Sequence, residues 1–234
     1  MRRYVFALMA GITPGLLYAD SAQERLNESA AIFQEIMATP DQAIPEELLS
    51  RAHCVVIVPG MKSGAFIVGG KYGRGFAMCR KDTNVGWGAP GAVRIEGGTF
   101  GFQIGGKETD VVMLVMNETG ARKLMDSKFT LGGQASVAAG PVGRTATANT
   151  DAYMRAEILS WSRSRGAFAG LALEGATLRN DVDENEELYG KRLENKDILM
   201  TDMNPPAAAQ PLLSALNRHS RSEQGGASAD RQKQ

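Results

Sequence analysis

Residues 129–190 read FTLGGQASVAAGPVGRTATANTDAYMRAEILSWSRSRGAFAGLALEGATLRNDVDENEELYG. The stretch has no long apolar stripe at helical spacing; it alternates glycines and other small residues with single apolar residues. Such alternation is typical of strands, and glycines without a regular period are typical of bulges, tight turns and close approach between strands. The stretch therefore predicts a glycine-rich β-domain, and it contains no obvious catalytic cluster.

The glycine excess is confined to one block of the chain. Of the 27 glycines among 234 residues, 22 lie between Gly60 and Gly175. The length and a hydrophobic content of 43% favour one domain with a full core.

Outward from this block, apolar patterning predicts short helices on either side of a run of strands. An apolar stripe at spacings of three and four residues predicts the first helix, over residues 20–39. Its stripe consists of Ala22, Leu26, Ala30, Phe33 and Met37. Further helices are predicted at 44–52, 118–127 and 183–190, and strands at 53–58, 65–70, 73–80, 93–105, 108–116, 129–139, 143–148, 156–163 and 167–178.

We expect residues 65–80 and 93–116 to form two hairpins, turning at Lys71-Tyr72 and near residues 105–107. The fold class that follows is α+β: a glycine-rich twisted antiparallel sheet or partial barrel, edged by three or four short helices.

The ends of the chain differ from its centre. Residues 1–19 have the layout of a signal peptide, with Arg2 and Arg3 before an apolar run. We expect residues 20–202 to form the domain. Residues 203–234 are polar and rich in Ala, Ser and Gly, which predicts a disordered tail.

The expected mature chain is slightly acidic. Without Arg2 and Arg3, the 26 basic residues become 24 against 26 acidic ones, so the net charge is −2. An anionic partner must therefore meet a local basic patch.

Catalysis and metal binding find little support among the polar residues. The two histidines, His53 and His219, lie at the start of a buried strand and in the tail, so neither suits a hydrolytic triad. Residues 181–187, DVDENEE, fit helix capping better than a calcium loop. We expect no enzyme activity, no cofactor and no metal site. Cys54 and Cys79 could pair in an oxidising compartment or remain buried thiols.

One candidate for lipid contact lies in residues 160–170, SWSRSRGAFAG. On a strand, Trp161, Arg163 and Arg165 share one face. An aromatic residue beside two arginines suits the boundary of a membrane, where arginine binds phosphate. The alternative is a salt-bridge site beside a core tryptophan.

A second candidate patch surrounds the first predicted hairpin. It consists of Lys71 and Arg74, with Arg80 and Lys81 nearby. We include Lys71 and Arg74 among the candidate lipid-binding residues.

The sequence resembles the SYLF-domain family in one consistent order from about residue 22 to residue 190. The matching sequence segments include IPEELL at 44–49, FIVGGKYGRG at 66–75, WGAP at 87–90, EGGTFGFQIG at 96–105, LGGQASVAAGPVGR at 131–144 and SRSRGAFAGLALEG at 162–175. The resemblance implies binding of phospholipids, notably phosphoinositides, without established catalysis. It also implies actin binding for some eukaryotic members.

From the residues and the resemblance together we expect a non-enzymatic phospholipid- or membrane-binding protein of the cell envelope, secreted to a bacterial periplasm. The expected partner is an anionic phospholipid surface, with no nucleic acid. We do not expect actin to be a partner, because an acidic helix stands where eukaryotic members carry a basic amphipathic segment. The alternative is a structural or protein-interaction module without direct lipid binding.

Overall fold

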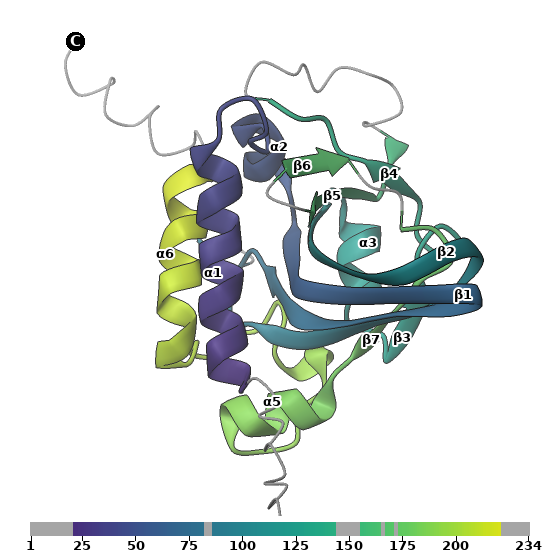
Figure 1. Cartoon of the computed structure of the whole chain (residues 1–234). Helices are drawn as coiled ribbons and strands as arrows, with labels where there is room; N and C mark the ends of the chain where they lie inside the picture. The colour runs from purple at the N-terminus through teal and green to yellow at the C-terminus, as the bar shows by residue number, and fades with distance from the viewer. Residues whose placement is uncertain (1–20, 82–85, 144–154, 165–166, 171–172, 221–234) are drawn as a thin grey trace, which may run out of the picture.

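The computed structural model describes residues 21–81, 86–143, 155–164, 167–170 and 173–220. Two long strands, β1 Cys54–Cys79 and β2 Gly91–Val115, pair antiparallel along most of their length and form a curled ribbon (Figure 1). The other strands are β3 Lys128–Thr130, β4 Val137–Ala139, β5 Ile158–Ser164, β6 Ala167–Gly170 and β7 Thr177–Asn180. The sheet has the order β3-β7-β2-β5-β4, with β1 paired to β2 and β6 paired to β5. The expected α+β class with a partial barrel is confirmed.

The ribbon curls so strongly that the two ends of β1 meet. Cys54 and Cys79 form a disulfide, which settles the pairing that the sequence leaves open. Where the two halves of β1 cross, a Cβ atom on Gly75 would lie 2.0 Å from the carbonyl oxygen of Ile57. Only glycine allows this approach, because any side chain would collide with the backbone of the first half.

The prediction of two hairpins is wrong. Lys71 and Tyr72 lie inside β1, opposite Gly97 and Glu96 of β2, and residues 105–107 lie inside β2. The bend comes instead from register shifts between Val58 and Met61 and around Gly64 to Ile67. Glycines favour bulges in a continuous strand as well as turns, so their sequence alone does not distinguish the two.

The expected strands that follow β2 are shorter than predicted. Residues 129–139 contain β3 and β4 separated by a turn, and residues 167–178 contain β6 and the start of β7. The predicted strand at 143–148 falls outside the described residues except for Gly143, which lies in a bend.

Away from the bend the ribbon is buried on both faces, so the start of β1 and the end of β2 read as continuous apolar runs. One face packs against α1 Ala22–Ala38, α2 Glu46–Arg51 and α6 Gln210–His219. The other packs against α3 Glu118–Lys123 and the short strands. Alternate residues of β1 divide between the two cores: Val55, Ile57, Phe76 and Met78 face the first, and Cys54, Val56, Ala77 and Cys79 the second.

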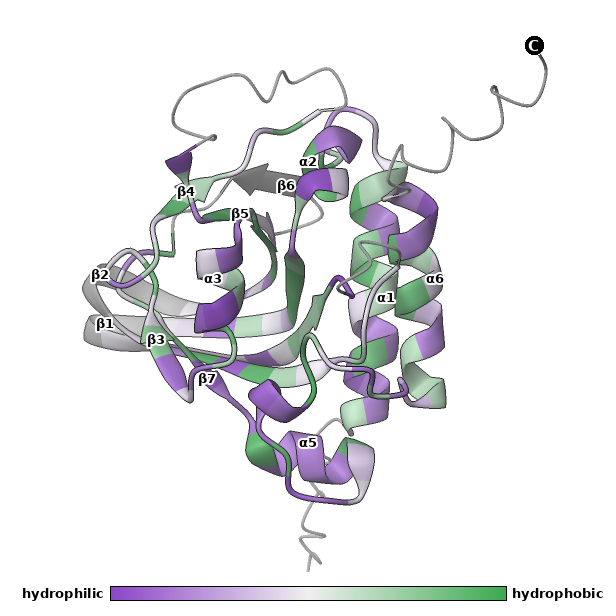
Figure 2. Ribbon diagram, turned by 180° about the vertical axis from the view of Figure 1, so that it is seen from behind, coloured by the Kyte–Doolittle hydropathy of each residue, from purple (hydrophilic) through white to green (hydrophobic). Residues whose placement is uncertain are grey.

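Helix α1 forms as its sequence predicts. Ser21 caps its first turn, with Glu24 completing a capping box, and the whole predicted apolar stripe is buried. The helix lies beside α6 and runs down toward α5 Val182–Tyr189, which is mainly hydrophilic (Figures 1 and 2). No helix among the described residues is long and apolar enough to cross a membrane.

The predicted disorder of residues 203–234 is wrong for the first part of that segment. A short helix η2 Ala207–Ala209 leads into α6, which buries Leu212, Leu213, Ala215 and Leu216. Four apolar residues on one side of a helix bury enough surface against α1 to order the segment, although its overall composition is polar. Residues 221–234, and residues 1–19 with the expected signal peptide, lie outside the described residues.

Candidate binding surface

Trp161 lies in the core of the protein and not at its surface. Its side chain has an exposed fraction of 0%, and the indole Nε1 donates a hydrogen bond of 2.8 Å to the carbonyl oxygen of Pro141. Gly140 lies against the ring, where a Cβ would come within 2.1 Å of it. The expectation of a tryptophan at the membrane boundary is therefore wrong, because the face of β5 that carries Leu159 and Trp161 packs toward the helices.

Arg163 shares that strand face but lies where β5 leaves the core. Its Nε and Nη2 are 2.6 Å from Oδ2 of Asp110 on β2, and its Nη1 pairs with Glu35 on α1. Burial alone would lower the pKa of Arg163, but its hydrogen bonds to Glu35 and Asp110 raise it, so the guanidinium stays charged. The structure thus supports the salt-bridge alternative for Arg163. Arg165 lies outside the described residues.

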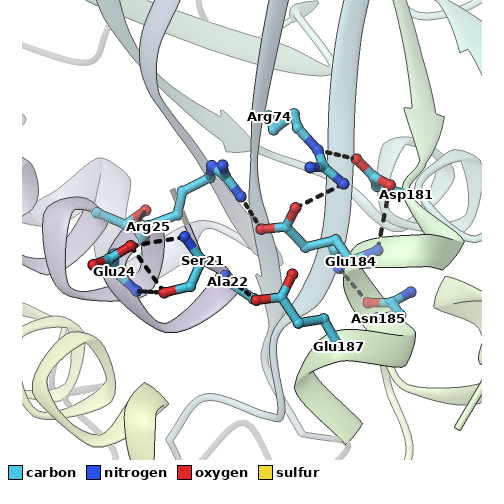
Figure 3. Close-up of polar contacts among 11 residues, drawn as sticks. Ser21, Ala22, Glu24, Arg25, Arg74, Asp181, Glu184, Asn185 and Glu187 are labelled. Atoms are coloured by element: carbon cyan, nitrogen blue, oxygen red, sulfur yellow. Dashed lines mark hydrogen bonds and ion pairs between the residues drawn. The ribbon is translucent and has the colours of Figure 1, made fainter. Parts of the chain in front are cut away.

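Arg74 also holds carboxylates instead of facing a partner. Its Nε donates a hydrogen bond of 2.6 Å to Asp181, and its Nη2 is 2.8 Å from Glu184 (Figure 3). Arg25 of α1 pairs with the other oxygen of Glu184, and both acidic side chains are 1% exposed. This set of four residues, the α5 ion cluster, joins α1, β1 and α5. Arg74 is thus held in ion pairs within the fold, and its assignment to a lipid patch remains a prediction.

The α5 ion cluster explains the acidic run at residues 181–187. Asp181 caps α5 by accepting a hydrogen bond from the backbone N–H of Glu184, and Glu187 accepts one of 2.9 Å from Ala22. Burial raises the pKa of Glu184, and the nearby Arg25 and Arg74 oppose that shift. Among the described residues no group of three His, Cys, Asp or Glu side chains could hold a metal ion. Two arginines, Arg25 and Arg74, pair with these buried carboxylates.

Arg80, the third cation of the second predicted patch, is 8% exposed. It donates hydrogen bonds to the carbonyl oxygens of Leu49, Ala52 and Ser220, and its guanidinium lies 4.4 Å from the ring centre of Trp87. These carbonyls lie at the C-terminal ends of α2 and α6, which carry partial negative charge. Burial lowers the pKa of Arg80. Arg80 therefore joins two helix ends to the end of β1.

Apart from Arg94, which pairs with Glu96, the remaining basic residues of β1 and β2 are three lysines around the bend of the ribbon. Lys62 and Lys107 are exposed, Lys71 is half-buried, and none of the three forms an ion pair with a described residue. Tyr72, next to Lys71, is 48% exposed and is one of two large hydrophobic residues exposed in the described part of the chain. We call Lys62, Lys71, Tyr72 and Lys107 the bend surface. Of the lipid-binding candidates expected from the sequence, only Lys71 belongs to it.

Of two hollows at the surface, one shows which residues of the bend lie near one another. A hollow of about 160 Å³ is lined by both Lys62 and Tyr72, and the α5 ion cluster contributes Arg25 and Arg74 to its wall. A second hollow, of about 170 Å³, lies beside the disulfide and is lined by His53, Arg80 and Lys81, among other residues. The first hollow shows that the two halves of β1 bring Lys62 and Tyr72 together across the bend.

Sequence reasoning missed the bend surface and the α5 ion cluster for the same reason. Both depend on which residues meet when β1 folds back on itself. A usable signal is the spacing of lysines around an uncharged, glycine-flanked segment, since residues 63–70 contain no charge.

Comparison with known proteins places the chain in a family. A profile of the Ysc84 family, described as Las17-binding protein actin regulator, matches residues 96–219, which is more than half of the chain. The chain is 37% identical over 179 residues to SH3 domain-containing protein PJ696.02 of Schizosaccharomyces pombe, covering 75% of this chain and 41% of that protein. It is 35% identical over 179 residues to Protein YSC84 of Saccharomyces cerevisiae (75% and 38%). It is 32% identical over 188 residues to the human SH3 domain-containing YSC84-like protein 1 (79% and 54%).

This chain belongs to the Ysc84 family of SYLF-domain proteins. The match spans between 38% and 54% of the length of these three relatives. The expectation that actin is not a partner is contradicted, because the family is described as an actin regulator and relatives are named for Las17 binding. That expectation rested on the acidic α1 alone, whereas the family profile matches residues 96–219, which do not include α1.

Proposed function

We propose that this chain is a non-enzymatic binding module that attaches to phospholipid membranes. The observation that carries the proposal is its membership of the Ysc84 family, matched across β2, the short strands and α6. The SYLF resemblance implies phospholipid binding for such a domain.

The contacts of the buried acidic side chains and of His219 support binding over catalysis. Asp110, Asp181 and Glu184 are held by arginines. His219 has its Nδ1 3.2 Å from Glu46 and lies edge-on to Phe33. A general base must be within hydrogen-bond reach of a substrate proton. The carboxylates hold α1 and α5 against the sheet, and His219 joins α6 to α1 and α2.

A second candidate is a protein partner of the actin-regulating kind. The family description and the name LAS seventeen-binding protein 3, borne by a relative 34% identical to this chain, favour it. The partner named for the relative becomes a candidate partner for this chain.

One experiment separates the two candidates. The full chain is sedimented with vesicles of phosphatidylcholine alone, with vesicles of equal parts phosphatidylcholine and phosphatidylglycerol, and with actin filaments. We expect the protein to sediment with the vesicles that contain phosphatidylglycerol. Sedimentation with filaments and with neither vesicle would reject membrane attachment in favour of the protein partner.

A further inference from the structure

We propose that the bend surface is the membrane contact of this protein, and that the β1–β2 ribbon meets an anionic phospholipid bilayer end-on. The inference rests on the proposed function and assigns to it a site that lies elsewhere than in the expected patch at Trp161 and Arg163. Its occupant is a bilayer whose headgroups carry negative charge.

The position of the bend suits such a contact. Strands β1 and β2 run out together to the side of the molecule away from α1 and α6, and they curl back there (Figure 1). A bilayer can approach this side without displacing either helix. Helices α1 and α6 then face away from the membrane.

Charge is distributed around the bend as an end-on contact requires. Lys62 lies opposite Glu108 in the register, and Ser63 lies opposite Lys107. Because residues directly opposite each other share a face and successive residues alternate, Lys62 and Lys107 lie on opposite faces of the ribbon. With Lys71 on the second half of β1, lysines surround the bend and are not confined to one face.

These lysines differ from the arginines of the same sheet in what they contact. Arg74 and Arg163 are held by carboxylates, whereas Lys62, Lys71 and Lys107 form no ion pair with a described residue. No ion pair among the described residues neutralises their charge, and the acidic residue nearest in the register is the exposed Glu108 opposite Lys62. For a chain whose expected mature net charge is −2, such a local group is the means by which an anionic surface can attract it. Each lysine near such a surface contributes about fivefold in affinity at moderate salt.

The uncharged components of the bend favour a bilayer over an acidic protein. Tyr72 is 48% exposed beside Lys71, and tyrosine is enriched where an apolar interior meets water. The chain between the lysines, AFIV at 65–68 and TFGFQIG at 99–105, contains no charged residue. An exposed tyrosine beside a lysine suits the headgroup region of a bilayer.

The test compares two double charge reversals in the full chain. Lys62→Glu with Lys107→Glu changes the bend surface, and Lys128→Glu with Lys191→Glu changes two exposed lysines elsewhere by the same total charge. Vesicle sedimentation uses equal parts phosphatidylcholine and phosphatidylglycerol. We expect the bend reversal to weaken binding at least about 20-fold and the control about threefold or less. Equal losses in both variants would overturn the assignment.

A third variant and a stability measurement accompany the two charge reversals. Tyr72→Ser should weaken binding severalfold without changing its salt dependence, since it removes no charge. Thermal melting of the control reversal and of Tyr72→Ser should match the parent, whereas Lys62→Glu places a second carboxylate opposite Glu108 and should lower the melting temperature slightly. If the parent itself fails to bind vesicles, the proposed function fails. If the bend reversal abolishes sedimentation with actin filaments but leaves vesicle binding unchanged, the bend is a protein-docking surface and the inference is wrong.

Discussion

Arg163 lies between Asp110 on β2 and Glu35 on α1, and its role illustrates how a side chain's contacts decide its function. From the sequence, Arg163 and Trp161 share a strand face, and that parity is correct. The alternation of side chains along β5 does not show where the core ends. That point depends on how α1 packs over the strand. The sequence predicts Lys71 and Tyr72 at a hairpin turn, but their exposure follows from the bend in β1.

Replacing Arg163 with alanine should destabilise the fold without affecting membrane binding. The change leaves Asp110, whose side chain is 13% exposed, without its partner. We expect a loss of about 1–2 kcal/mol in the free energy of unfolding, because the pair is only partly buried. Urea unfolding measures this loss.

Arg192→Ala is the control, because its partners Asp183 and Glu186 are exposed. This variant should change the free energy of unfolding by less than about 0.5 kcal/mol. Weaker vesicle binding by the Arg163 variant at unchanged stability would restore the original lipid patch.

At the scale of elements, sequence pattern succeeds where a helix is amphipathic and fails where a strand bends. Helix α1 has a full apolar stripe and a capping box, so local signals determine it. Strands β1 and β2 are interrupted by glycines, and only their mutual register distinguishes a bulge from a turn. Helix α6 was missed because a compositional average hides four apolar residues in a short segment.

Helix α6 should contribute measurably to stability. Leu216 has an exposed fraction of 0% and packs in the core that α1 and α6 share with the ribbon. We expect Leu216→Ala to cost about 3 kcal/mol and to lower the melting temperature by roughly 10 °C. Ser214→Ala on the exposed side of the same helix is the matched control and should be nearly neutral. Equal melting temperatures for the two variants would mean that α6 does not dock in solution.

At the scale of the whole molecule, three ties hold distant parts of the chain around the curled ribbon. The disulfide joins the ends of β1, Arg80 joins β1 to the ends of α2 and α6, and the α5 ion cluster joins α1 to α5. The disulfide closes a loop with a sequence separation of 25, which corresponds to about 3.5 kcal/mol of chain entropy. The sequence predicts the α+β class from local patterns. It does not predict these ties, because each depends on residues far apart in the chain. The signal peptide and the periplasmic location remain predictions.

The arrangement of the molecule on a membrane is the central claim, and amide hydrogen exchange measures it most directly. The full chain is exchanged alone and with vesicles of equal parts phosphatidylcholine and phosphatidylglycerol. We predict added protection in the segments around the bend, residues 62–72 and 97–107, and unchanged exchange in α1 and α6. Protection of α1 or of residues 158–164 with no change at the bend would contradict the account.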